Sequence, residues 1–213
     1  MAWTTTAIKA KIKKLIGDTG ADDAELLILI NHFYQNVLPL EFHLKALEDI
    51  MIVTCIDGID SYDIDPDSYL SVNGPAWIDD LGTSELYQIP FRQDSTAFWT
   101  EYPEPTAAGS YDKDLPESVL YWHQTIYPRP CPDDAYLIGI ESYLKPTALG
   151  SGDSPMEDLW GPILAYDVAI DILFDRQDTD PIEGILAARK ISAGKISRKE
   201  LMQFENVRSV GRW

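Results

Sequence analysis

Apolar residues recur with the period of a helix near the start of the chain and alternate with polar residues in its middle. The first helical pattern predicts a helix over residues 5–16. The second predicts a helix that begins near Asp22 or Asp23 and is closed by Pro39, because proline restricts the preceding backbone. Two antiparallel helices joined by a short turn follow, since each buries its apolar stripe against a neighbour.

The helical pattern returns in the last third of the chain. Ser154 and Glu157 have the spacing of a capping box, with Pro155 at the first helical position, so we expect a helix to start there. This helix is apolar around most of its circumference, and it is buried either in the core of its own domain or by a neighbouring subunit. A second capped start at Asp180 predicts a helix to about Ile191, followed by a glycine and a basic tail.

A strand-like pattern begins at Asp49, and we expect residues 49–146 to form a β insertion. A short helix is predicted within it over 91–101. Two alternating segments, 119–126 and 136–144, flank a proline-rich stretch that lacks backbone donors, so we expect an antiparallel hairpin with a rigid tip. The other predicted strands, separated by Gly, Pro and Asp, are 50–55, 61–64, 69–78 and 86–89.

These patterns predict an α+β fold. Helices from both ends of the chain form a helical bundle, the residues between them form an antiparallel β insertion, and the C-terminus is an extended tail. The expected domains are the N-terminal helices of the bundle (1–48), the β-rich insertion with its short helix (49–146), the C-terminal helices of the bundle (147–195) and a basic docking tail (196–213).

Charge is distributed unevenly along the chain. The net charge of −18 argues against free DNA binding, because phosphate contact needs clustered Lys and Arg. Residues 1–188 hold 33 acidic and 10 basic side chains, a net charge of −23, whereas residues 189–213 hold 2 acidic and 7 basic ones, a net charge of +5. The basic end is either a solvated terminus or a tail that docks on a partner, and its apolar residues favour docking.

The sequence contains no motif for catalysis, phosphate binding or zinc binding, so we expect no catalytic residue, no metal and no cofactor. The acidic run from Asp57 to Asp67 does not have the spacing of an EF-hand, and a solvated turn is favoured over a calcium site. Cys55 and Cys131 lie in separate segments and predict no disulfide. The apolar runs are too short for a membrane span, so no membrane association is expected.

The order of elements resembles the head-to-tail adaptor (connector) proteins of tailed bacteriophages, the group that includes tail tubular protein A of short-tailed phages. The resemblance is carried by a helix ending in ILINHFYQNVLP, an extended SYDIDPDSYLSV segment, the hairpin IYPRPCPDDAYLIGIESYLKP, the helix SPMEDLWGPILAYDVAIDILF and a terminal tail. It implies a structural virion protein of the neck and not an enzyme. It also implies a homo-oligomeric ring of about twelve copies at the head–tail junction, because a closed ring repeats one contact around an axis.

The resemblance further implies the partners of such a ring. These are the portal protein above, neighbouring copies at the sides, a tail or nozzle protein below, and genomic DNA that passes through the channel without sequence-specific binding. The C-terminal tail is expected to bind the portal, with basic groups that steer and apolar groups that anchor. Its candidate residues are Lys195, Arg198, Lys199, Phe204, Val207, Arg208, Arg212 and Trp213. The candidate tail-side contact is the hairpin tip, Tyr127, Pro128, Arg129 and Pro130.

The main alternative is a soluble binding module for carbohydrate, because exposed aromatic side chains stack on sugar rings and line ligand sites. A weaker alternative is a hydrolase, which needs two facing carboxylates in a cleft. The aromatic candidates for the binding module are Trp77, Trp99, Tyr102, Tyr111, Tyr121 and Trp122.

Overall fold

A computed structural model describes residues 2–80, 85–103 and 112–209 of the chain, with side chains described except at residues 80, 85 and 200–209. The fold is of the mixed α+β class, with helices and two four-stranded sheets. The chain divides into two compact units. Residues 1–44 and 146–213 form the first, here called the helical unit, and residues 45–145 form the second, the β unit.

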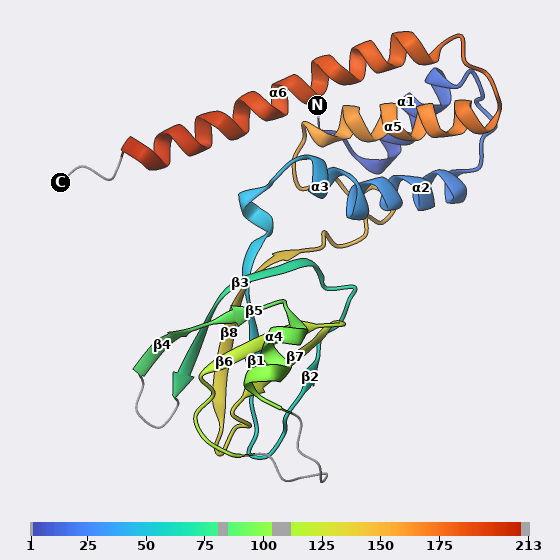
Figure 1. The fold of residues 1–213 in the computed structure, drawn as a ribbon. Coiled ribbons are helices and arrows are strands. Elements are labelled where there is room, and N and C mark those ends of the chain that lie inside the picture. Colours follow the sequence, from blue (N-terminus) through green and yellow to red (C-terminus); the bar gives the residue numbers. More distant parts are fainter. Residues whose placement is uncertain (1, 81–84, 104–111, 210–213) are drawn as a thin grey trace. The chain divides into compact units, whose positions relative to one another are not determined.

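Among the residues that the structure describes, the helical unit has five α-helices. Helix α5 (Trp160–Asp175) packs against three of the others, α1 (Thr5–Leu15), α2 (Asp23–Asn36) and α6 (Ile182–Ser209) (Figure 1). A short helix, α3 (Leu38–Glu41), follows α2 directly. The core of this unit therefore lies around α5.

The two predicted N-terminal helices are confirmed, and side-chain caps explain where they begin. The Thr4 hydroxyl accepts a hydrogen bond from the Ala7 N–H at the start of α1, and the Asp22 carboxylate accepts one from the Ala24 N–H at the start of α2. Such caps satisfy backbone donors that have no partner inside the helix. Pro39 does not close the segment as predicted. It lies in the first turn of α3, where a proline needs no hydrogen-bond donor.

Helix α5 begins at Trp160 and not at Pro155, so the predicted capping box is wrong. The groups that would form the cap interact instead with residues distant in the sequence. The Met156 N–H donates to the Tyr34 hydroxyl at 3.1 Å, and the Glu157 carboxylate pairs with Lys199 of α6. The helix instead starts from a turn in which the Trp160 N–H donates to the Glu157 carbonyl at 2.9 Å.

The apolar circumference of α5 is buried within the helical unit. Its buried residues include Trp160, Ile163, Ala165 and Leu173, whose positions are distributed around the helix axis. Trp160 makes an edge-to-face contact with Tyr34 of α2, with ring centroids 5.7 Å apart. The interpretation of α5 as a core helix therefore accounts for these residues without a neighbouring subunit.

The Gly/Ser-rich segment before α5 is held in place by polar side chains of α1 and α2. Asn31 donates to the Leu149 carbonyl at 3.1 Å and accepts from the Leu149 N–H at 2.7 Å. The Thr5 hydroxyl donates to the Gly150 carbonyl at 3.0 Å, and it accepts from the Gly152 N–H at 2.6 Å. The segment is thus a fixed part of the helical unit.

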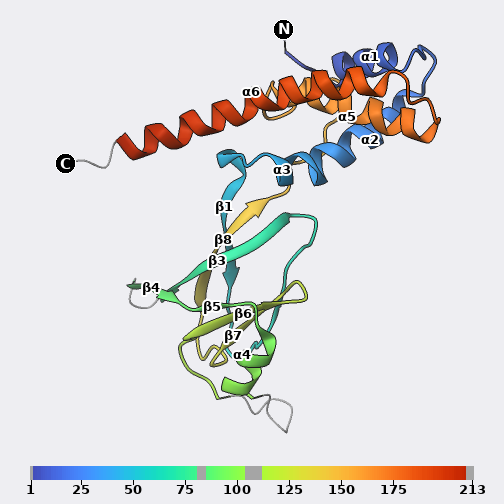
Figure 2. The same cartoon turned by 45° about the horizontal axis from the view of Figure 1, so that its top comes forward.

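Helix α6 continues for 28 residues to Ser209, so the prediction of an extended C-terminal tail is wrong for the described residues. The chain after Ile191 has no proline, and one glycine inside a helix costs only about 1 kcal/mol. Ile196 is 3% exposed, so the helix still packs against the unit beyond Gly194. In both views the C-terminal part of α6 extends past the end of α5 (Figures 1 and 2).

The first sheet of the β unit is antiparallel throughout. Its strands, in spatial order, are β1 (Glu48–Thr54), β8 (Tyr136–Leu144), β3 (Tyr69–Asp80) and β4 (Glu85–Ile89). Strands predicted from the alternating pattern are confirmed at each of these places. A short 3₁₀ helix, Lys45–Leu47, precedes β1.

The second sheet contains strands in the order β2 (Tyr62–Asp63), β7 (Thr125–Arg129), β6 (Ser118–Trp122) and β5 (Phe91–Arg92). Strand β5 pairs with β6 in parallel, so the β unit is not purely antiparallel as predicted. The predicted helix over 91–101 starts later, as α4 (Ser95–Glu101).

The two sheets share one hydrophobic core. On the first sheet, β1 and β8 contribute residues from alternate positions, such as Met51, Val53, Ile138 and Ile140. The second sheet contributes buried residues of β6 and β7, Val119 and Ile126. This alternation is the period of a strand with one face on a core.

The proline-rich hairpin does not form as predicted. The chain turns earlier, between β6 and β7, where His123 and Gln124 have φ values of 50° and 64°. Two consecutive residues with positive φ make the tight turn whose twist matches a two-residue hairpin. Strands β7 and β8 belong to different sheets, so the stretch between them connects the sheets and is not a hairpin tip.

Candidate interaction surfaces

No group of three His, Cys, Asp or Glu side chains that could hold a metal ion occurs among the side chains that the structure describes. The carboxylates of the acidic run between β1 and β3 have separate protein partners. Three of them form ion pairs: Asp57 with Lys113 at 2.8 Å, Asp60 with Arg129 at 3.7 Å and Asp67 with Lys145 at 3.3 Å. None of the described helices combines the length and the apolar character of a membrane span.

The outer face of the first sheet, opposite the shared core, is an exposed apolar surface of the β unit. Ile52 is 64% exposed and Leu86 is 69% exposed, although both lie within strands. The register places Ile52, Gly139 and Trp77 in one row across β1, β8 and β3, and Leu137 and Leu86 in the next row. An antiparallel sheet usually presents polar side chains on its free face, so this outer face is exceptional.

The outer face contains an apolar hollow. Its volume is about 270 Å³, and its lining comes from all four strands of the first sheet. Gly139 forms part of it because a glycine leaves the backbone uncovered, and a Cβ there would lie 3.1 Å from Ile50 Cγ2. The lining residues are Ile50, Ile52, Trp77, Asp79, Leu86, Leu137 and Gly139.

Two acidic residues lie at the ends of this apolar surface. Asp79 is half-buried and is paired with Leu137 and Leu86 in the register, and Glu141 is exposed and is paired with Ile50. Residues 137 and 141 are four positions apart on β8, which corresponds to about 13 Å along a strand. The hollow thus has a carboxylate on each side.

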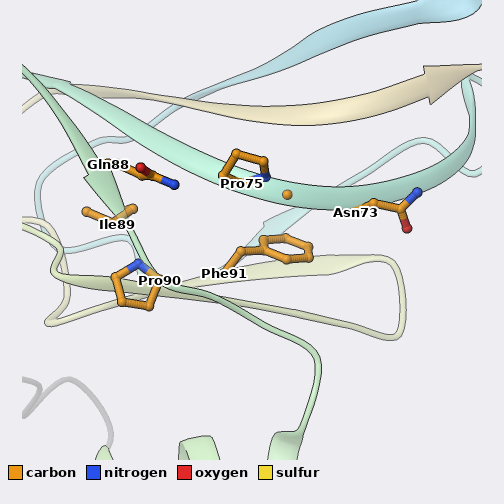
Figure 3. Close-up of a pocket in the computed structure, with 7 residues that line it drawn as sticks. Asn73, Pro75, Gln88, Ile89, Pro90 and Phe91 are labelled. Atoms are coloured by element: carbon orange, nitrogen blue, oxygen red, sulfur yellow. The ribbon is translucent and has the colours of Figure 1, made fainter.

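A second pocket, of about 480 Å³, lies beside the bulge in β3 (Figure 3). In Figure 3 the ring of Phe91 faces β3 next to Pro75, and a Cβ on Gly74 would lie 2.7 Å from atoms of that ring. Gly74 also has a φ of 65°, a conformation that favours glycine. The seven lining residues include no titratable side chain, so their side chains provide no group for acid–base chemistry. They are Asn73, Gly74, Pro75, Gln88, Ile89, Pro90 and Phe91.

The predicted tip residues are not on a tip. Tyr127, Pro128 and Arg129 lie inside β7, and Pro130 follows it directly. Pro128 pairs with Val119 on β6. Counted from the turn, this pair is one of the non-hydrogen-bonded pairs of the ladder, so the N–H that proline lacks is not needed for a hydrogen bond to β6. The predicted placement on a hairpin tip is therefore wrong, and Pro128 and Arg129 are buried, whereas Tyr127 and Pro130 are partly exposed.

Arg129 is 4% exposed and stabilises the interior of the β unit. Its guanidinium donates to the Asp60 carbonyl at 3.0 Å and to the Pro128 carbonyl at 2.8 Å. It also lies over the Trp99 ring, 5.3 Å from the centroid. A buried arginine with these partners stabilises the fold and is not presented to a partner.

The aromatic residues of the carbohydrate hypothesis do not form one platform. Trp99 packs edge-on against Tyr127, Tyr102 packs on Phe98, and Tyr121 stacks on Phe91. Trp122 is exposed beside the β6–β7 turn, whereas Trp77 lies on the outer face of the first sheet. Tyr111 lies outside the described residues.

The predicted docking tail falls on α6 and beyond it. Lys195 and Arg198 are exposed, and Lys199 pairs with Glu157. Phe204, Val207 and Arg208 are in the helical backbone of α6 without described side chains, and Arg212 and Trp213 lie outside the described residues.

An ionic cluster fixes the first half of α6. Arg189 donates to the Asp167 carboxylate on α5 and, at 2.9 Å, to the Glu41 carboxylate on α3. Burial raises the pKa of Asp167, while the hydrogen bond from Arg189 opposes that rise. The cluster joins three helices and thereby orients α6 within the helical unit.

One exposed face of α6 carries basic side chains near an exposed apolar residue. Ile191 is 66% exposed, and Lys190 and Arg198 are exposed on the same side of the helix. Ala187 lies one turn before Lys190 and Gly194 lies between Ile191 and Arg198, and a Cβ on Gly194 would meet no atom within 4 Å. We call these five residues the outer face of α6.

Neither outer face was predicted from the sequence. The signal for the first was present in β1, where Ile50, Met51, Ile52 and Val53 are consecutive apolar residues, a pattern typical of a strand covered on both faces. The signal for the second was hidden because the helix was expected to end near Ile191.

Comparison with known proteins leaves the family open. No protein-family model matches the sequence, and no curated protein matches it significantly.

Proposed function

We propose that this chain is a head-to-tail adaptor of a tailed bacteriophage, a structural protein of the virion. The observation that carries the proposal is α6, a 28-residue helix whose first half is fixed by Arg189 and whose C-terminal part extends past α5. Residues 189–213, which lie in this helix and directly after it, have a net charge of +5 against −23 for the remainder of the chain. A projecting basic element suits docking on a partner.

In this proposal the chain has the architecture of a helical bundle with a β insertion, and its copies form a closed ring beneath the portal. The contiguous segment 45–145 supports the insertion, because both flanking segments belong to the helical unit. A ring requires that one surface of each copy contacts a different surface of the next. The exposed apolar outer face of the first sheet is of the kind that such contacts bury.

The acidic charge suits a channel that DNA traverses. The β unit holds 19 acidic and 5 basic side chains, a net charge of −14. Carboxylates that face a lumen repel the phosphate backbone and prevent the duplex from adhering. If lumen-facing acids are neutralised in assembled virions, we expect slower DNA ejection, and an unchanged ejection rate would contradict this role of the charge.

The direct test is binding of the chain to the portal ring of its own virus. The variant truncated after Lys199 keeps the buried Ile196 and the Lys199–Glu157 pair, so its helical unit should fold. We expect the full chain to co-sediment with the portal and the truncated chain to remain in the supernatant. Equal binding by the two chains would contradict docking through the C-terminal segment. Glycan binding without portal binding would favour the carbohydrate-binding alternative.

A further inference from the structure

The outer face of the first sheet and the outer face of α6 are complementary in shape. The sheet offers an apolar hollow of about 270 Å³ whose lining includes the uncovered backbone of Gly139. The helix offers an exposed isoleucine, Ile191, next to Ala187 and Gly194, which allow close approach. A helix packed on a sheet is one of the standard ways to bury an apolar sheet face.

The two faces also have opposite charges at matching positions. Asp79 and Glu141 are about 13 Å apart along the strand direction. Lys190 and Arg198 are eight residues apart on α6, which corresponds to about 12 Å along a helix. On the sheet the two carboxylates lie at opposite ends of the hollow, and on the helix Lys190 is adjacent to Ile191 while Arg198 lies about two turns further along. Both basic groups can therefore meet a carboxylate when Ile191 enters the hollow.

We propose that the outer face of α6 in one copy binds the outer face of the first sheet in a neighbouring copy. Ile191 enters the hollow, and Lys190 and Arg198 pair with Asp79 and Glu141. The contact joins two different surfaces, so it is heterologous and repeats from copy to copy. This deepens the proposed function, on which it rests, because it identifies the two surfaces that a ring joins.

Cysteine cross-linking between two separately prepared variants tests the proposal. Leu86→Cys places a thiol at the hollow, and Ile191→Cys places one on the helix. The native Cys55 and Cys131 are buried and do not compete. When the two full-length variants are mixed under oxidising conditions, at high concentration or on the portal ring, we expect a mixed dimer. The matched control is Leu86→Cys with Ile28→Cys, because Ile28 is equally exposed on α2, and it should give no mixed dimer.

Charge reversal distinguishes loss of this contact from misfolding as the cause of a lower cross-linking yield. Lys190→Glu with Arg198→Glu, introduced in both cross-linking partners, should reduce the yield of the mixed dimer at least about tenfold, because like charges then face each other. Asp79→Lys with Glu141→Lys should do the same. A chain that carries all four substitutions restores opposite charges, and the yield should recover. Failure to recover would contradict the pairing.

The outcomes distinguish this inference from the proposed function. Portal binding without the mixed dimer would overturn the inference and leave the adaptor proposal intact. The mixed dimer without portal binding would support the contact and count against the adaptor. A chain with both cysteines that cross-links only within itself would also overturn the inference, since α6 would then cover the sheet of its own chain.

Discussion

The helical unit and the β unit use their apolar residues differently. In the helical unit, the most apolar helix, α5, is enclosed by α1, α2 and α6. In the β unit, the first sheet has apolar side chains on both faces, and only one face is covered by the shared core. The charges differ as well, since the β unit has a net charge of −14 and the helical unit, with 16 acidic and 12 basic side chains, has −4.

This difference separates residues that make the fold from residues that are left for a partner. Burial of α5 gains its free energy within the chain, so its apolar character needs no further explanation. The outer face of the first sheet gains less from folding alone, since Ile52 and Leu86 remain 64% and 69% exposed. An exposed apolar sheet face of this kind is therefore a surface that an interaction would stabilise.

The largest expected effect compares neighbouring positions on the two faces of the first sheet. Ile140→Ala removes a fully buried side chain and should lower the free energy of unfolding by about 3 kcal/mol, through lost burial and a cavity. Ile52→Ala changes an exposed side chain and should lower it by less than about 0.5 kcal/mol. Denaturant unfolding of both variants measures this. Similar losses would show that the outer face is buried in the free protein.

A similar effect is expected in the helical unit for Arg189→Met. The substitution leaves the buried Asp167 carboxylate without its cation and should lower the free energy of unfolding by about 3 kcal/mol at pH 7. The folded-state pKa of Asp167 is already raised by burial, and loss of Arg189 raises it further.

The sign of the pH dependence follows from that raised pKa. The folded state holds the Asp167 proton more tightly than the unfolded state, so protonation stabilises the fold as the pH falls through the folded-state pKa. The loss caused by Arg189→Met should therefore shrink between pH 7 and about pH 4. Chemical unfolding across this range measures it, and a loss that grows on acidification would contradict the assignment.

Smaller effects are expected at a matched pair of helix caps, one in each unit. Asp22 caps α2 with a bond to the Ala24 N–H, and Asp94 caps α4 with bonds to the Thr96 and Ala97 N–H groups. Replacement of either by Ala should cost about 1 kcal/mol. Thermal unfolding of the two variants measures this. A loss near zero for Asp94→Ala would indicate that α4 is not held by its cap.

The smallest effect concerns the thiols, which report on the β unit alone. Burial raises the pKa of Cys55 to about 12, and burial also raises the pKa of Cys131, so both should react slowly in the folded protein. If the two units unfold separately, Arg189→Met should leave the rate of thiol labelling unchanged, whereas Ile140→Ala should increase it. Faster labelling in Arg189→Met would show that the units unfold together.

The sequence predicted elements well where local patterns decide them and poorly where tertiary contacts do. The stripes of α1 and α2 and the alternation of β1 and β3 identified these elements directly. The start of α5 was wrong because Tyr34 and Lys199, distant in sequence, occupy its capping groups. The turn at His123 and Gln124 lacks the glycine or asparagine that marks such turns, so Arg129 was expected on a tip.

The candidate surfaces were predicted less completely. The unequal charge along the chain indicated the basic C-terminal region, and Lys195 and Arg198 are indeed exposed on α6. The outer face of the first sheet depends on register, which brings Ile52, Gly139 and Trp77 into one row from three strands. Such a juxtaposition is not encoded in any local pattern.

The most direct test of the adaptor proposal is mass photometry of the full chain, alone and mixed with the portal ring of its own virus. We expect a discrete complex that saturates when each portal subunit is matched by one copy of the chain. No association at any ratio or salt concentration would contradict it.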